Sequence, residues 1–344
     1  MKKISRKVEL NFKESSGKYK RTNKSTLTKE YGEIPGNALR GLVVSSVGLF
    51  YSVRFLQDDG NRFINCHSAG TIITKNFDST LIAVGDYVYF VIEQDETHGE
   101  IGYIVAVEDR RNCFSRLSLT GKNFEQVLAA NIDNLLIMQS TKTPRINKRL
   151  IDRYLVTAEL NLIKPIICIN KIDLIDIERL KPEFNAYFEL GIPVHFVSIQ
   201  EEIGMDAIKE VLAGKKTVLS GPSGVGKSSL LNFLMGRRVQ SVKEISRKSS
   251  KGVHTTSFAK LFEYEEGSEV IDTPGIREFG IWGLEKNDLP LYFHEFDPYA
   301  RDCKFNSCTH IHEPGCRVIE ALEAGEIDLD RYESYLNIFD SLDD

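Results

Sequence analysis

The feature that most constrains the fold of this sequence is a glycine-rich segment at 221–228, which reads Gly-Pro-Ser-Gly-Val-Gly-Lys-Ser. The apolar run 217–219 before it predicts a buried strand, and residues 228–235 after it have a helical pattern that ends at Gly236. Glycines allow successive backbone N–H groups to turn inward around a phosphate, where a Cβ atom would obstruct the curve. The segment therefore predicts a phosphate-binding loop between a strand and a helix.

Two side chains of this loop have specific tasks in such sites. We expect the ammonium of Lys227 to reach the β- and γ-phosphates of a nucleotide, and the hydroxyl of Ser228 to ligate Mg²⁺. The nucleotide-binding residues predicted in the loop are Gly221, Ser223, Gly224, Val225, Gly226, Lys227, Ser228 and Ser229.

A second motif, Asn170-Lys171-Ile172-Asp173, follows the apolar run 166–169 and precedes the phosphate loop in the chain. Asn and Asp are common turn formers, so these four residues alone would indicate only a turn. Beside a complete phosphate loop, however, Asp173 can accept two hydrogen bonds from guanine, whereas adenine offers a different donor pattern. Asn170 would support the loop, the stem of Lys171 would cover the base, and Ser198 could offer a backbone N–H to the base oxygen. The expected ligand is GTP or GDP.

A third motif, Asp272-Thr-Pro-Gly275, follows the short apolar run 269–271. A carboxylate at a strand end holds Mg²⁺, usually through water, and Gly275 would let a backbone N–H approach the γ-phosphate. In the polar segment 249–257, a threonine would complete the Mg²⁺ shell only when GTP is bound. Thr255 and Thr256 are both candidates for that threonine.

The residue after the third motif predicts slow hydrolysis. Many GTPases have a glutamine there that orients the attacking water, and Ile276 cannot do so. His254 is the nearest polar substitute, and a solvent-facing loop histidine is the alternative interpretation. The predicted catalytic residues are Lys227, His254, Thr255 and Thr256.

Near the C-terminus, the pattern Cys303-x4-Cys308-x-His310-x5-Cys316 offers three thiolates and an imidazole within a short segment. Zn²⁺ prefers four such ligands in a tetrahedron, and a closed site of this kind is structural. His312 could replace His310, and free buried cysteines are the other alternative. The remaining three cysteines are scattered, which suits a reduced compartment better than a disulfide framework.

The segment before residue 114 has a different pattern, with short runs rich in β-branched and aromatic residues between turn formers. We expect strands at 42–47, 49–55, 70–74, 87–92 and 102–107. Five short strands favour an OB-fold barrel, with an SH3-like barrel as the alternative. The predicted domains are a flexible basic arm at 1–35, an OB-fold barrel at 36–113, an α/β GTPase domain at 114–280 and a helical zinc-binding domain at 281–344.

The formal net charge of −5 conceals a division of charge along the chain. Residues 1–35 hold ten basic and four acidic groups, whereas the chain from Arg317 onward holds nine acids and two arginines. A basic arm is attracted to phosphate backbones, although it could also serve only as a solubilising tail. No apolar run approaches the about 18 residues that span a bilayer. We expect a cytoplasmic monomer without a membrane partner.

The order of the motifs is unusual, because the base-reading motif comes before the phosphate loop and not after it. Such a domain is circularly permuted. With a barrel before it and the Cys/His cluster after it, the chain resembles the RsgA family, also called YjeQ, over about residues 37–340. The stretches that carry the resemblance are 129–133, 151–154, 224–230, 254–256, 272–280 and the Cys/His cluster.

The resemblance implies an OB-fold, a permuted GTPase domain and a zinc-containing C-terminal domain. It also implies binding to the small ribosomal subunit and its rRNA late in maturation, with subunit-stimulated GTP hydrolysis followed by release. The family's switch histidine falls on His254, and its zinc ligands fall on Cys303, Cys308, His310 and Cys316. Two other interpretations are a nucleotide-gated RNA-binding scaffold with incidental hydrolysis and a GTP-dependent translation factor.

Overall fold

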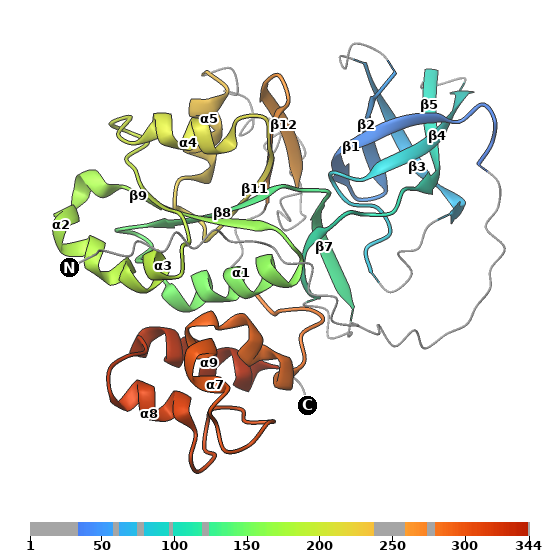
Figure 1. Ribbon diagram of the computed structural model, residues 1–344. Coiled ribbons are helices and arrows are strands. Elements are labelled where there is room, and N and C mark those ends of the chain that lie inside the picture. The colour runs from blue at the N-terminus through green and yellow to red at the C-terminus, as the bar shows by residue number, and fades with distance from the viewer. Residues whose placement is uncertain are drawn as a thin grey trace, which may run out of the picture.

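The structure is a computed structural model that describes residues 34–57, 62–73, 79–95, 99–118, 124–236, 259–273 and 279–342. A β-barrel, a central α/β domain and a helical C-terminal domain follow one another along the chain (Figure 1). The predicted site residues His254, Thr255, Thr256 and Gly275 lie outside the described residues, as do Ile276 and residues 1–33 of the predicted arm. Within the described ranges, no helix has the length and apolar character needed to cross a bilayer.

Five strands form the N-terminal barrel. They pair in the order β1-β2-β3-β5-β4, and β4 pairs back with β1, which closes the sheet. Strands β3 and β5 are parallel, and the other neighbours are antiparallel. This arrangement confirms the predicted OB-type barrel over the SH3-like alternative. The strands are β1 (Leu39–Val47), β2 (Phe50–Phe55), β3 (Phe63–Ile73), β4 (Tyr87–Asp95) and β5 (Gly99–Val107).

The third strand begins seven residues before the predicted start at Gly70. Ile64 and Cys66 face the barrel core, whereas Asn65 between them is exposed. The alternation of buried and exposed side chains is that of a half-buried strand. The polar residues on its outer face interrupt the apolar run, which is why the sequence prediction placed the strand too late.

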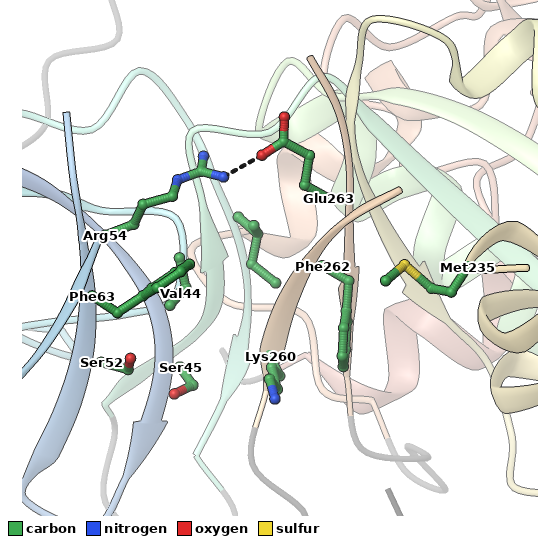
Figure 2. A pocket seen from close by; sticks show the side chains of 10 residues that line it. Val44, Ser45, Ser52, Arg54, Phe63, Met235, Lys260, Phe262 and Glu263 are labelled. Carbon is green, nitrogen blue, oxygen red and sulfur yellow. Dashed lines mark hydrogen bonds and ion pairs between the residues drawn. The ribbon is translucent and has the colours of Figure 1, made fainter. Parts of the chain in front are cut away.

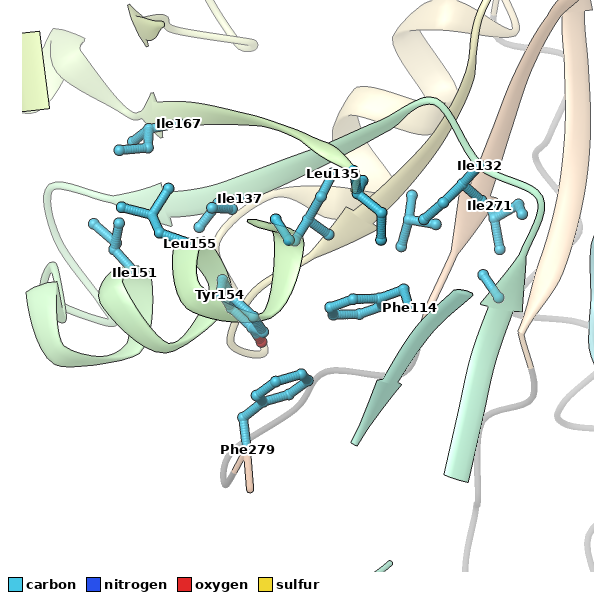
Figure 3. Close-up of a cluster of buried hydrophobic side chains, with 14 of the residues drawn as sticks. Phe114, Ile132, Leu135, Ile137, Ile151, Tyr154, Leu155, Ile167, Ile271 and Phe279 are labelled. Atoms are coloured by element: carbon cyan, nitrogen blue, oxygen red, sulfur yellow. The ribbon is translucent and has the colours of Figure 1, made fainter. Parts of the chain in front are cut away.

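A two-stranded ribbon of β6 (Cys113–Leu117) and β7 (Glu125–Ala130) connects the barrel to the central domain, and the sequence analysis did not predict it. Phe114 of this ribbon is fully buried and stacks on Phe279, with ring centroids 5.4 Å apart. Tyr154 meets the edge of the Phe279 ring at 4.8 Å (Figure 3). These three rings anchor the chain where it leaves the central domain after the Asp272 motif.

The central domain is built on a sheet with strand order β10-β9-β8-β11-β13-β12. The first five of these strands are parallel and β12 is antiparallel to β13. The strands expected at 166–169, 217–219 and 269–271 are present as β9, β11 and β13. The strands are β8 (Asn134–Ser140), β9 (Lys164–Asn170), β10 (Val194–Phe196), β11 (Lys216–Ser220), β12 (Lys260–Glu265) and β13 (Ser268–Asp272).

Helices cover both faces of this sheet, as a parallel sheet requires. Helices α1 and α3 lie on one face, and α4 and α5 lie on the other (Figure 1). The helices of the domain are α1 (Lys148–Leu160), α2 (Ile177–Leu180), α3 (Asn185–Glu189), α4 (Met205–Leu212) and α5 (Lys227–Leu234), with the 3-10 helices η1 (Ile172–Leu174) and η2 (Lys181–Phe184).

Alternate side chains of β8 enter the two cores on either side of the sheet. Leu135 and Ile137 pack on the side of α1, against residues that include Ile151 (Figure 3). Leu136 and Met138 pack into the opposite core with residues of α4 and α5. All seven residues of β8 are buried. The strand therefore fixes the height of both helical layers above the sheet.

The barrel and the central sheet meet along β1 and β12, where Ser45 pairs with Lys260. Arg54 of β2 crosses this junction and donates to the carboxylates of Glu263, at 2.5 Å, and Glu269. A groove of about 530 Å³ lies beneath the first of these ion pairs and includes Phe63 and Phe262 (Figure 2). One arginine thus ties the barrel to both strands of the β12–β13 hairpin.

The C-terminal domain lies against the outer side of α1 (Figure 1). Its core includes Tyr335 and Phe293 together with Val156 of α1. Tyr332 and Tyr335 of the last helix are both buried in this domain. The helices are η3 (Lys286–Tyr292), η4 (His294–Phe296), α7 (Asp297–Ala300), α8 (Arg317–Glu323) and α9 (Leu329–Ser341).

A buried ion pair joins the two domains. Asp152 of α1 is fully buried and accepts a hydrogen bond from Arg331 of α9 at 2.5 Å. Tyr187 also donates to Asp152, at 3.0 Å, and Glu295 accepts from the Arg331 Nε at 2.7 Å. Each charge is out of water and depends on its partners, because an isolated buried charge is costly.

Replacing Arg331 with methionine should lower the free energy of unfolding by about 3–5 kcal/mol, because Asp152 is left buried without its cation. Urea denaturation measures this difference. Arg149→Met is the matched control, since Arg149 pairs with Glu333 across the same two helices but both side chains are at least half exposed. Equal losses in the two variants would contradict the role of burial.

The contact between η4 and α1 should depend on pH. Hydrogen bonds to Glu159, at 2.7 Å, and to Asp297 raise the pKa of His294 to about 9 from an ordinary 6.5. The stabilisation by protonated His294 is complete below pH 6.5 and is lost as the pH rises through about 9. The difference in Tm between the wild type and His294→Gln should therefore shrink as the pH rises from 6.5 to about 9. A difference in Tm that stays constant over this pH range would contradict the stabilising role of protonated His294.

Candidate nucleotide and metal sites

Three functional segments meet at one edge of the central sheet. The phosphate loop follows β11, Asn170 ends β9, and Asp272 ends β13. The order β9-β8-β11-β13 is parallel throughout, so the carboxyl ends of these strands lie side by side. Ligands of open α/β sheets bind outside these ends.

Two glycines of the phosphate loop are required by close approaches of neighbouring segments. Gly221 has φ +148°, and a Cβ there would lie 2.2 Å from the carbonyl oxygen of Met138. Gly226 has φ +108°, and a Cβ there would lie 2.3 Å from the amide nitrogen of Asn170. The loop can therefore approach β8 and the base-reading motif only with glycine at these positions.

The side chain of Asn170 ties together three loops. Its Nδ2 donates to the carbonyl oxygen of Val225 at 2.9 Å, and its Oδ1 accepts from the backbone N–H of Ile199 at 3.2 Å. The side chain is buried, so neither bond competes with water. The expected supporting role of Asn170 has a geometric basis, since it fixes the phosphate loop relative to the segment that contains Ser198.

Asp173 faces the same edge. Its Oδ1 accepts a hydrogen bond from the Ser198 hydroxyl at 2.6 Å, and that hydroxyl oxygen accepts from the backbone N–H of Glu201 at 3.2 Å. Ser198 therefore orients the carboxylate of Asp173, and the backbone of Glu201 orients Ser198. The sequence analysis expected only a backbone contribution from Ser198, so its side-chain contact with Asp173 is an additional finding.

Lys227 and Asp272 face each other at the phosphate loop. The Lys227 Nζ donates to the carbonyl oxygens of Gly221, at 2.7 Å, and Pro222, at 3.0 Å. Burial lowers the pKa of Lys227, and the nearby carboxylate of Asp272 opposes this effect. Burial likewise raises the pKa of Asp272, and Lys227 opposes it.

The Oδ1 atom of Asp272 is buried and has no hydrogen-bond partner among the described residues. A buried carboxylate oxygen without a donor is destabilising unless a cation or water meets it. Ser228 is exposed in the first turn of α5. The donor set of Asp272 and Ser228 fits Mg²⁺, which binds few protein oxygens and keeps several waters.

A segment that the sequence analysis did not single out completes this edge. Residues 140–144, which begin at the last residue of β8, contact Lys171. The Nζ of Lys171 donates to the carbonyl oxygens of Thr143 and Gly224, each at 2.8 Å. The signal for this segment was its position, because a polar run directly after a buried parallel strand opens onto the same edge.

The structure thus brings together all predicted nucleotide-binding residues that it describes. Their individual contacts with a nucleotide remain predictions. The set comprises Asn170, Lys171, Asp173, Ser198, Gly221, Ser223, Gly224, Val225, Gly226, Lys227, Ser228, Ser229 and Asp272.

The second site is the cysteine cluster of the C-terminal domain. One ligand atom from each of Cys303, Cys308, His310 and Cys316 lies within 4.8 Å of the others. The Nδ1 of His310 lies 3.6 Å from the Cys303 sulfur and 3.4 Å from the Cys316 sulfur. All of these cysteines are free thiols. Three thiolates and one imidazole that converge on one point fit a structural Zn²⁺ site.

The structure selects His310 and not His312 for this cluster, because His312 is exposed and His310 is buried. The surrounding loop is held by Glu313, whose carboxylate accepts from the backbone and hydroxyl of Thr309 at 2.7 and 2.6 Å. Tyr332 of α9 donates to the carbonyl oxygen of His310 at 2.7 Å. A metal here would connect the loop to the last helix.

The purified protein should contain about one zinc ion per chain, and Cys316→Ser should remove it, because a structural site needs all four ligands. Metal analysis by mass spectrometry measures the content. His312→Asn is the control and should keep its zinc, since this residue lies outside the cluster. A metal-free wild type, or zinc retained in Cys316→Ser, would rule out the site.

Comparisons with known proteins agree with this geometry. The chain is 41% identical over 310 residues to a small ribosomal subunit biogenesis GTPase RsgA of Chlorobaculum parvum, covering 89% of this chain and 99% of the relative. It is 38% identical to an RsgA 2 of Bacteroides thetaiotaomicron, covering 88% and 96%.

Two solved structures have the same fold. YjeQ from Thermotoga maritima matches with a TM-score of 0.65 and 32% identity, covering 88% of this chain and 97% of that one. YloQ, described as a circularly permuted GTPase, matches with a TM-score of 0.61 and 29% identity, covering 89% and 95%. The sequence profile of the RsgA GTPase family matches residues 107–282. With its permuted order of motifs, its barrel and its Cys/His cluster, the chain belongs to the RsgA family of GTPases.

Proposed function

We propose that this protein hydrolyses GTP during late maturation of the small ribosomal subunit, and that it binds rRNA in its GTP state. The observation that carries the proposal is the meeting of Asp173, Lys227 and Asp272 at one edge of the sheet. The curated relatives are named small ribosomal subunit biogenesis GTPases, which supports the choice of partner.

The residues at this edge divide the work of holding GTP. Asp173, held by Ser198, accepts hydrogen bonds from guanine, and the helix N-terminus at α5 faces the phosphates. Lys227 exchanges its two loop carbonyls for phosphate oxygens. Asp272 and Ser228 would hold Mg²⁺, which would supply positive charge beside the phosphate oxygens.

The remaining catalytic assignments lie outside the described residues. Thr255 or Thr256 completes the Mg²⁺ shell, Gly275 approaches the γ-phosphate, and His254 orients the attacking water. Ile276 cannot orient water, so turnover without a partner is slow. The ribosomal subunit accelerates it by helping to position the water, and release follows hydrolysis.

The flanking domains would hold the RNA. The barrel is joined by Arg54 to the hairpin that ends in Asp272, and the C-terminal domain is joined by Arg331 to α1. Zn²⁺ at the cysteine cluster would be structural, because all four positions of the tetrahedron are protein ligands. A change at the nucleotide would therefore reach the barrel through the ion pair of Arg54 and the C-terminal domain through that of Arg331.

Isolated small ribosomal subunits should raise the GTP turnover of this protein by at least about tenfold, since partners that complete the catalytic site of other GTPases give about 10³- to 10⁵-fold. Phosphate release under multiple-turnover conditions measures the effect. Lys227→Ala should abolish turnover with and without subunits, and Lys209→Ala, on the surface of α4, should not.

Unchanged turnover in the presence of subunits would favour the scaffold interpretation, in which hydrolysis is incidental. Stimulation by intact ribosomes but not by isolated small subunits would favour a translation factor. Either outcome would contradict the proposed function, whereas stimulation by the small subunit alone supports it.

A further inference from the structure

Residues 140–144, Ser-Thr-Lys-Thr-Pro, form a segment that we call the lysine clamp. The segment begins at the last residue of β8, which lies between β9 and β11 in the sheet. It therefore stands between the base-reading motif after β9 and the phosphate loop after β11. A Cβ atom added at Gly224 of the phosphate loop would lie 3.6 Å from the Cδ of Pro144, so the clamp and the loop lie next to each other.

Thr141 of the clamp holds the backbone of Lys171. The Thr141 hydroxyl donates to the carbonyl oxygen of Lys171 at 2.6 Å, and the Thr141 backbone N–H donates to the carbonyl oxygen of Asn170 at 3.1 Å. Lys171 has φ +66° and ψ +37°, in the left-handed region that a side chain makes unfavourable. Such a conformation persists only when neighbouring groups hold it.

The clamp also holds the side chain of Lys171. The ammonium donates to three carbonyl oxygens, those of Lys142 at 3.2 Å, Thr143 at 2.8 Å and Gly224 at 2.8 Å. The clamp itself is closed by the buried Ser140 hydroxyl, which donates to the carbonyl oxygen of Pro144 at 2.9 Å. The stem of Lys171 is thereby stretched from the base-reading loop to the phosphate loop.

We infer that Thr141 is a positioning residue for base recognition. Its hydroxyl fixes the peptide of Lys171, two residues before Asp173, and so sets where the carboxylate and the lysine stem meet the guanine ring. This inference rests on the proposed guanine site. It assigns to a residue outside the N-K-x-D motif a share in the selection of the base, because a misplaced Asp173 loses its directional hydrogen bonds first.

Removing this hydroxyl should weaken both the affinity for guanine nucleotides and the preference for guanine. Thr141→Val keeps the shape and the backbone bond to Asn170, and the loss of one hydrogen bond predicts about five- to tenfold weaker GDP binding. IDP lacks the exocyclic amine that Asp173 would read, so its affinity should fall less. The ratio of the Kd values for IDP and GDP should therefore decrease.

The experiment uses the full-length protein and displacement of a fluorescent GDP by unlabelled GDP or IDP. Thr141→Ser keeps a hydroxyl at this position and should therefore keep both the affinity for GDP and the preference for guanine. Thr141→Ala also lacks the hydroxyl, and it serves as a second test in case valine perturbs the loop. Thr80→Val is the matched control, since it removes a hydroxyl that accepts from the backbone N–H of Val127 at 3.0 Å, outside the nucleotide edge. The Tm of each nucleotide-free variant is measured alongside.

Two outcomes would overturn the inference. In the first, Thr141→Val and Thr141→Ala bind GDP as the wild type does. In the second, GDP and IDP weaken by the same factor, which indicates a merely structural role. Asp173→Asn separates these failures from that of the proposed site, because an amide at 173 should donate to the extra oxygen of XDP and favour it over GDP. If Asp173→Asn leaves base preference unchanged, the guanine site itself is wrongly placed.

Discussion

The site depends on one buried amide. Asn170 ends a strand, and its side chain donates to the phosphate loop and accepts from the segment after the next strand along the chain. The relative positions of these three loops are therefore fixed by one side chain. Because the amide has both a donor and an acceptor, no aliphatic or acidic residue of similar size could make both bonds. The required glycine at 226 follows from this, since the loop passes directly against the amide nitrogen. Lys227 is the next residue, so the contact between Gly226 and Asn170 also determines where Lys227 lies.

Much of this arrangement could be predicted from the sequence, because short motifs at strand ends determine their own geometry. The strands before Asn170, Gly221 and Asp272 are apolar runs, and parallel strands bring their carboxyl ends together. The barrel was predictable from its five strands, although the polar outer face of β3 concealed where that strand begins. The choice of His310 over His312 needed the structure or a family resemblance, since spacing alone allowed both.

Other features could not be predicted because they are contacts between distant segments. Arg54 pairs with Glu269 across 215 residues of sequence, and nothing in either neighbourhood indicates a partner. The β6–β7 ribbon is too short and too mixed in polarity to stand out, and only its contact with Phe279 shows its purpose. The clamp on Lys171 acts largely through backbone carbonyls, which every residue possesses and no sequence pattern records. The hydrogen bonds between Lys171 and the clamp could therefore be found only from the structure.

The buried Asp152 has a consequence for the way the chain is made. Its partner Arg331 comes 179 residues later in the chain and is therefore synthesised after it. Until then, α1 presents a carboxylate on a face that will be covered, and water must solvate it. The same face supplies Val156 to the C-terminal core, so that domain has no complete interior without α1. Closure of the C-terminal domain onto the first helix of the GTPase domain therefore waits until Arg331 has been synthesised, and a chain truncated before this residue would keep the helix open to chaperones and proteases.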